Sequence, residues 1–171
     1  FTVNDVTTFA DLVKAWEKRE QTLSRIMDIY MSQKESRVLE NQFIGLLQVL
    51  ESLHRELFPP DPSLEAIFKV RLQSIHEKVR GVLEETDREL LKVNLEYANQ
   101  KRLSERLVDL DNLLQKEGIQ GLEQWDANKI ARTRNNLTHV TQHGNTYNAK
   151  EMLQIIRCLN RMAQALILKE L

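Results

Sequence analysis

Three residues in the last third of this 171-residue chain could together cleave a phosphodiester bond: Arg134, Asn135 and His139. Near neutral pH an imidazole can take a proton from a ribose 2′-hydroxyl or protonate a leaving oxygen. A guanidinium can pair with phosphate oxygens and offset the charge that develops at phosphorus. An asparagine side chain can hold either partner by hydrogen bonds. These residue types therefore suit RNA cleavage by attack of the 2′-hydroxyl.

The segment that carries these residues has the apolar spacing of a helix, which we expect from 126 to 142. Asn135 and His139 are four residues apart and so share a face. Arg134 lies about 100° round the helix axis and must reach back to that face. Because one histidine cannot easily act as base and acid at once, the motif also predicts a dimer in which a second copy supplies the other histidine.

The elements around this segment are also predicted to be helices, because the chain has only 5 Gly and 3 Pro and is rich in helix-favouring residues. We expect them at 9–31, 37–58, 62–83, 90–97, 101–116 and 148–171. Asp61 before Pro62, and Asn148 with Glu151, are typical helix starts, and Gly118 is a typical stop. The expected fold is all-α, a bundle of about five to seven helices.

The length fits a single domain over 1–171. An alternative is that the helix in 1–35 is an extension or linker to an upstream domain, since the chain begins at Phe1 rather than Met. No apolar run is long enough to predict a membrane-spanning helix, and no signal peptide is visible. The single cysteine, Cys158, lies in an apolar-periodic stretch and is expected to be a buried, inert thiol.

Charge is unevenly distributed along the chain. The net charge is −1, yet residues 128–168 carry six basic side chains and one acidic one, a local charge of +5. A basic patch of this kind can approach a phosphate backbone. A solvated basic face accounts for the charge equally well, so both interpretations stay open.

The motif resembles a known family signature. Residues 134–139, Arg-Asn-Asn-Leu-Thr-His, are similar to the HEPN signature of Arg, a polar residue, three variable positions and His. The run 133–139 resembles in particular the Apea-like HEPN subgroup of bacterial anti-phage proteins. Glu-Asn-Gln-Phe at 40–43 and Leu-Glu-Ser-Leu-His-Arg at 50–55 resemble the helix that precedes the catalytic helix in that subgroup. The resemblance covers roughly 36–171.

This resemblance implies a metal-independent endoribonuclease that needs no cofactor and acts as a homodimer with a composite active site. Arg134, Asn135 and His139 take the catalytic positions, and the products would end in 2′,3′-cyclic phosphate and 5′-hydroxyl. The implied role is an effector of abortive infection in the bacterial cytoplasm, restrained by an N-terminal sensor domain in a longer chain.

Further residues are candidates for binding RNA, with a solvated or salt-bridged face as the alternative. They are Glu51, His54, Arg55, Arg132 and His143. His139 and His143 have the spacing of a helical metal pair, but no carboxylate ligand is near in sequence, so no metal site is expected. The alternative functions are a non-catalytic HEPN-like module that dimerises or binds RNA, and a plain helical interaction domain.

Overall fold

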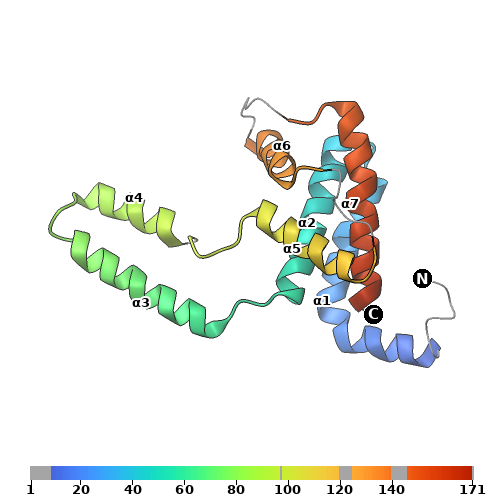
Figure 1. Cartoon of the computed structure of the whole chain (residues 1–171), viewed down its shortest axis with the longest axis horizontal. Coiled ribbons are helices and arrows are strands. Elements are labelled where there is room, and N and C mark those ends of the chain that lie inside the picture. The colour runs from blue at the N-terminus through green and yellow to red at the C-terminus, as the bar shows by residue number, and fades with distance from the viewer. Residues whose placement is uncertain (1–8, 97, 120–124, 140–145, 171) are drawn as a thin grey trace. The chain divides into compact units, whose positions relative to one another are not determined.

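The chain folds into helices alone wherever its structure is described. The computed structural model describes residues 9–96, 98–119, 125–139 and 146–170, and no strand occurs among them (Figure 1). The helices of this part are α1 Phe9–Glu35, α2 Leu39–Leu57, α3 Pro62–Val79, α4 Glu85–Glu96, α5 Leu103–Lys116, α6 Ala127–His139 and α7 Ala149–Glu170. The predicted all-α class is confirmed. None of these helices combines the length and hydropathy of a membrane span.

The chain divides into two compact units. One comprises residues 1–57 and 103–171, and the other comprises 58–102. The first unit holds α1, α2, α5, α6 and α7, and the second holds α3 and α4. A single domain over 1–171 therefore stays a prediction.

Helix α2 is the centre of the larger unit. Within its 19 residues, α2 packs against α1, α5 and α7, with α6 also touching it. Its buried residues recur at helical spacing on more than one side: Phe43, Gly45, Leu46, Leu47, Val49, Leu50, Leu53 and His54. A helix that is apolar over so wide an arc must be covered by several neighbours, and α7 lies beside it on one of these sides (Figure 1). The pair Pro59–Pro60 follows directly after α2, as its missing N–H groups predict.

Helices α1 and α2 approach most closely at Gly45. A Cβ at this position would lie 2.5 Å from the Cβ of Gln33, so only glycine fits the observed separation. The hydroxyl of Tyr30 on α1 donates to the side-chain oxygen of Asn160 on α7 at 2.9 Å. These contacts fix α1 on both α2 and α7.

In the smaller unit, α3 and α4 pack as a hairpin. Asp61 caps α3 as expected, because its Oδ1 accepts the backbone N–H of Ser63 at 2.8 Å. Helix α4 begins at Glu85, five residues before the predicted start at Leu90. The polar first turn hid this start, although Glu85 and Asp87 are acidic residues of the type that stabilise a helix N-terminus.

Several predicted local features are confirmed. Gly118 has a φ of 71° just beyond α5, the left-handed conformation of a helix stop. Cys158 is buried, and burial raises the pKa of its thiol, as expected for an inert cysteine.

Two helix ends differ from the prediction or cannot be compared with it. Helix α1 continues to Glu35, past the predicted end at Met31. The predicted ends of α6 at Gln142 and Gly144 lie outside the described residues.

Candidate active site

Helix α6 begins at a side-chain cap. Asp126 precedes it, and its Oδ1 accepts the backbone N–H groups of Asn128 at 2.8 Å and Lys129 at 3.2 Å. The guanidinium of Arg132 lies 3.7 Å from the other carboxylate oxygen of Asp126. Arg132, a predicted RNA-binding residue, is therefore on α6 as expected but directs its charge towards the start of the helix. Its role with RNA stays a prediction.

A buried threonine holds α6 against the segment that leads into α7. The hydroxyl of Thr133 donates to the backbone oxygen of Lys129 at 2.8 Å and accepts the backbone N–H of Tyr147 at 3.2 Å. Thr133 is 2% exposed and Tyr147 is 8% exposed, so neither hydrogen bond is readily replaced by water. Together with fully buried Ile130, this contact fixes the rotation of α6 about its axis.

Lys129 joins the same junction from the other side. Its ammonium lies 4.3 Å from the centre of the Tyr147 ring and 3.2 Å from a carboxylate oxygen of Glu151. Asn148 and Glu151 form the predicted capping box, with backbone-to-side-chain bonds of 2.9 and 3.0 Å. The hydrogen bond from the Asn148 N–H, and then Lys129, lower the pKa of the Glu151 carboxyl. The basic side chain of Lys129 is thus used to join α6 to α7.

The rotation set by Thr133 and Ile130 leaves Asn135 and His139 on the exposed side of α6 and Arg134 nearer its packed side. Arg134 is half-buried, whereas Asn135 and His139 are exposed. A guanidinium nitrogen of Arg134 donates to the side-chain oxygen of Asn135 at 3.3 Å, and a role for Asn135 in orienting Arg134 stays a prediction. His139 is the last described residue of α6. Asn135 and His139 lie one turn apart, with Cβ atoms about 5–6 Å from each other.

The candidates on α2 have different surroundings. His54 is buried, and its Nε2 lies 2.8 Å from Oδ2 of Asp109 on α5. This pair links α2 to α5 inside the larger unit. Glu51 is half-buried and Arg55 is exposed on the same helix. Substrate binding by these three residues stays a prediction, and His143 lies outside the described residues.

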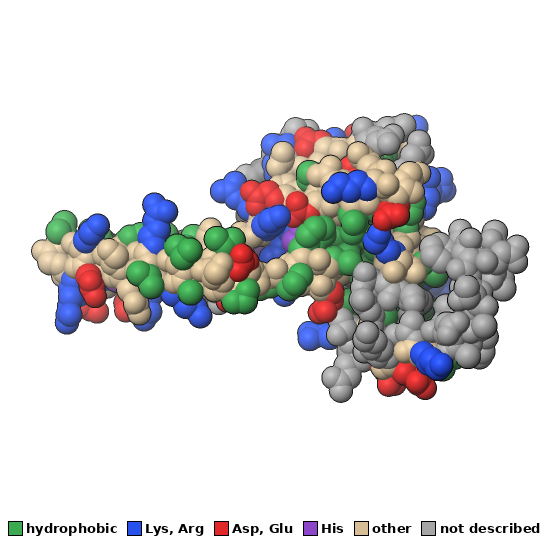
Figure 2. Space-filling view, turned by 60° about the horizontal axis from the view of Figure 1, so that its bottom comes forward, with side chains coloured by type: hydrophobic (Ala, Val, Ile, Leu, Met, Phe, Trp, Pro, Cys, Tyr) green, Lys and Arg blue, Asp and Glu red, His purple; other side chains and the backbone are tan. Residues whose placement is uncertain are grey.

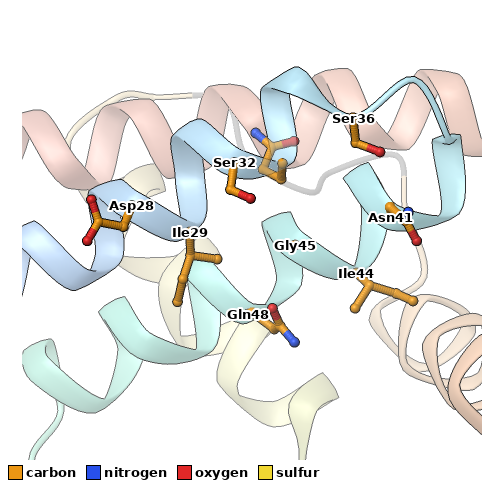
Figure 3. A pocket seen from close by; sticks show the side chains of 9 residues that line it. Asp28, Ile29, Ser32, Ser36, Asn41, Ile44, Gly45 and Gln48 are labelled. Atoms are coloured by element: carbon orange, nitrogen blue, oxygen red, sulfur yellow. The ribbon is translucent and has the colours of Figure 1, made fainter.

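A groove of about 580 Å³ lies between α1 and α2 (Figure 3). Six of its nine lining residues have polar side chains, and all nine come from α1, α2 and the connection between them: Asp28, Ile29, Ser32, Gln33, Ser36, Asn41, Ile44, Gly45 and Gln48. None of the candidate catalytic residues on α6 belongs to this lining.

Part of the predicted basic patch forms a row on α7. Lys150, Arg157 and Arg161 are all exposed and are separated by seven and four residues. These separations place them on one face of the helix, about 10 Å and about 6 Å apart along its axis. The other basic residues of the patch are on α6, where Lys129 and Arg132 pair with acids. The exposed cations of the patch that do not pair with an acid in the described part of the chain are therefore those on α7, and half-buried Arg134 is on α6.

Two features of the site were not predicted from the sequence. Asp109 was not recognised as the partner of His54, since the two residues are 55 positions apart and only the packing of α2 on α5 joins them. The anchoring role of Thr133 was also not predicted, although a hydroxyl on the apolar side of an amphipathic helix was an available signal. Among the described residues, no group of three or more His, Cys, Asp or Glu side chains is arranged to hold a metal ion.

Comparison with known families agrees with the all-α fold. The family model described as Apea-like HEPN matches residues 44–171, about three quarters of the chain. The chain therefore belongs to the Apea-like HEPN family. HEPN domains are generally nucleases that bind RNA and dimerise, so membership indicates an RNA-related function. No curated protein and no solved structure matches the chain.

Proposed function

We propose that this chain is a metal-independent endoribonuclease whose catalytic residues are Arg134, Asn135 and His139. The observation that carries the proposal is the accessible face of α6, on which the Arg134–Asn135 hydrogen bond lies one helical turn from His139. Family membership supports an RNA substrate. The row of cations on α7 supports the approach of a phosphate backbone to the same unit.

In the proposed reaction the 2′-hydroxyl of a ribose attacks the adjacent phosphorus. One imidazole accepts the hydroxyl proton while the new 2′-oxygen–phosphorus bond forms and the bond to the 5′-oxygen breaks. An imidazolium donates a proton to the departing 5′-oxygen, which leaves a 2′,3′-cyclic phosphate and a 5′-hydroxyl. Arg134 pairs with the non-bridging oxygens of the phosphate, whose charge grows in the transition state. Asn135 holds the guanidinium in place and can also donate a hydrogen bond to the phosphate.

The two proton transfers require two imidazoles in opposite protonation states. No second histidine lies on α6 within the described residues, so His139 of a second copy is the proposed partner. The active enzyme is then a homodimer with a composite site. In the cell this activity would serve abortive infection from the cytoplasm, with a sensor domain in a longer chain restraining it.

The test is cleavage of end-labelled RNA by the purified chain in EDTA. His139→Ala should lower the cleavage rate by about 10²–10⁴-fold, the range for loss of general acid–base catalysis. His76→Ala on α3, a histidine outside the proposed site, is the matched control and should cleave as the wild type does. The downstream products should accept a 5′-phosphate from a kinase without prior phosphatase treatment, as a free 5′-hydroxyl requires.

Two outcomes would refute the proposal. Cleavage that EDTA abolishes would exclude the metal-independent mechanism. Equal cleavage by the wild type and His139→Ala would exclude the site. RNA that is bound by the wild type but not cut, at protein concentrations where the dimer forms, would favour the non-catalytic binding module.

A further inference from the structure

The unit formed by residues 58–102 exposes an unusual amount of aliphatic side chain. The exposed fractions are 63% for Leu64, 63% for Ile67 and 67% for Val70 on α3, and 64% for Leu90 and 62% for Val93 on α4. In Figure 2 hydrophobic side chains alternate with charged ones along this unit. Short helices draw most of their stability from packing an apolar face, and α3 buries none of its 18 residues.

The exposed aliphatic residues form a second face on each helix. On α3 the half-buried residues Phe68, Leu72, Ile75 and Val79 follow one helical stripe. Leu64, Ile67 and Val70 recur every three residues on an adjoining stripe, and Leu90 and Val93 do so on α4. We call these five residues the hairpin surface. Packing within one hairpin leaves the hairpin surface open.

The net charges of the two helices differ in sign, and the basic residues Arg71 and Lys78 adjoin the hairpin surface on α3. The stretch from Pro62 to Arg80 carries four basic and two acidic residues, whereas α4 carries four acidic and two basic ones. The basic side chains are Lys69, Arg71, Lys78 and Arg80, and none forms an ion pair with another described residue. The ion pairs of α4 in the described part, Arg88–Glu85 and Lys92–Glu89, stay within that helix.

We infer that the hairpin surface is covered by the hairpin of a second copy of this chain, with α3 of each copy against α4 of the other. A two-fold axis makes each contact occur twice and places the basic helix of one copy on the acidic helix of the other. Five aliphatic side chains provide on the order of 300–500 Å² of apolar surface per copy. With their polar margins, two copies bury about 1,000 Å² or more, the lower limit for a specific interface.

RNA is a poorer occupant of the hairpin surface. Residues 58–102 contain eight basic and eight acidic residues, so the unit has no net attraction for a phosphate backbone. Aliphatic stripes also offer no aromatic ring on which bases could stack. A second copy matches both the apolar stripes and the opposite charges beside them.

This inference deepens the proposed function, on which it rests only for its consequence: residues 58–102 add a contact between the two copies to the one that a composite site makes at α6. The composite site would then depend on residues 58–102, which hold none of its catalytic groups. Variants of the hairpin surface should lower the specific cleavage activity at low protein concentration, with His139 and Arg134 unchanged.

The first test is the mass of the whole chain in sedimentation velocity over a range of concentrations. The wild type should sediment as a dimer of the 20.0 kDa chain. The double variant Ile67→Lys, Leu90→Lys should raise the dimer dissociation constant by about tenfold or more. Val108→Lys with Leu153→Lys is the matched control, since these residues are also exposed but lie on α5 and α7. It should dimerise as the wild type does, and circular dichroism should give all three the same helix content.

The second test does not depend on how well lysine is tolerated in the hairpin. One variant reverses the charge beside α3, Arg71→Glu with Lys78→Glu, and another reverses the charge beside α4, Asp87→Lys with Glu89→Lys. Each alone should dissociate, because it opposes like charges. An equimolar mixture should restore the dimer, since both contacts of the mixed pair then join opposite charges.

Three results would overturn the inference: a monomeric wild type at high concentration, a dimer unaffected by the lysine variants, or a mixture that stays as dissociated as its components. The mass is measured without RNA. A failed cleavage assay would therefore refute the ribonuclease and leave the dimer contact standing.

Discussion

Replacing Thr133 with valine tests whether one buried hydroxyl fixes the position of α6. Valine keeps the shape of threonine but removes the acceptor of the Tyr147 N–H and the donor to the Lys129 oxygen. The Lys129 oxygen keeps its place in the helix, whereas the N–H of buried Tyr147 loses its partner. An unsatisfied buried donor costs about 1–3 kcal/mol. For a chain of this length, that corresponds to a melting temperature lower by roughly 2–12 °C.

The control is on the same helix. Thr138 is exposed, and within the described part of the chain its hydroxyl donates to backbone oxygens of its own helix, those of Arg134 and Asn135. Thr138→Val should therefore change the free energy of unfolding by no more than about 0.5 kcal/mol, and Thr133→Ser should keep most of the wild-type stability. Urea unfolding followed by circular dichroism measures all three. Equal midpoints for Thr133→Val and Thr138→Val would show that the hydroxyl does not anchor α6.

Three further predictions follow from the packing and the charges. Gly45→Ala should destabilise the chain by about 1–3 kcal/mol, because a Cβ there lies 2.5 Å from the Cβ of Gln33 on α1. Gly81→Ala, with open space around it, should be near neutral in the same urea titration. Equal effects of the two substitutions would disprove the close contact. Because the pKa of Glu151 is lowered on folding, its carboxylate stabilises the folded state above its unfolded pKa of about 4.3 and loses this effect as the pH falls through the folded pKa. The melting temperatures of the wild type and Glu151→Gln should thus differ at pH 7 and converge in acid, and a constant gap would contradict the cause assigned. Arg157→Glu on the α7 row should weaken RNA binding more than Arg25→Glu on α1, an equal change of net charge, and should flatten its salt dependence; equal effects in fluorescence anisotropy would rule out the row as an RNA contact.

The predictions from sequence were most accurate where the signal is local. The cap at Asp61, the capping box of Asn148 with Glu151 and the stop at Gly118 depend on residues within a few positions of each other, and all are confirmed. The missed start of α4 has the same explanation. Its first turn is polar, and apolar spacing cannot detect a turn that has no apolar residue.

Apolar spacing correctly predicted that α3 is a helix, but it did not predict which of its apolar residues are covered by other helices. Leu64 and Ile67 have the same helical periodicity as Leu46 and Leu50, yet the first pair is mostly exposed and the second pair fully buried. Periodicity records which side of a helix is apolar, and it contains no information about whether another element covers that side. The exposed aliphatic residues of α3 became evident only when the neighbours of each helix were known.

For the candidate site, the sequence by itself determined the residue types and the shared face of Asn135 and His139, because the pitch of a helix is the same in every protein. The tertiary structure decided which way that face points. Ile130 and Thr133 bind one side of α6 to the core and to Tyr147, and this leaves Asn135 and His139 exposed and Arg134 half-buried. The tertiary structure also decided that His54 pairs with Asp109. Contacts between residues far apart in sequence depend on how the helices pack, and no local pattern encodes that packing.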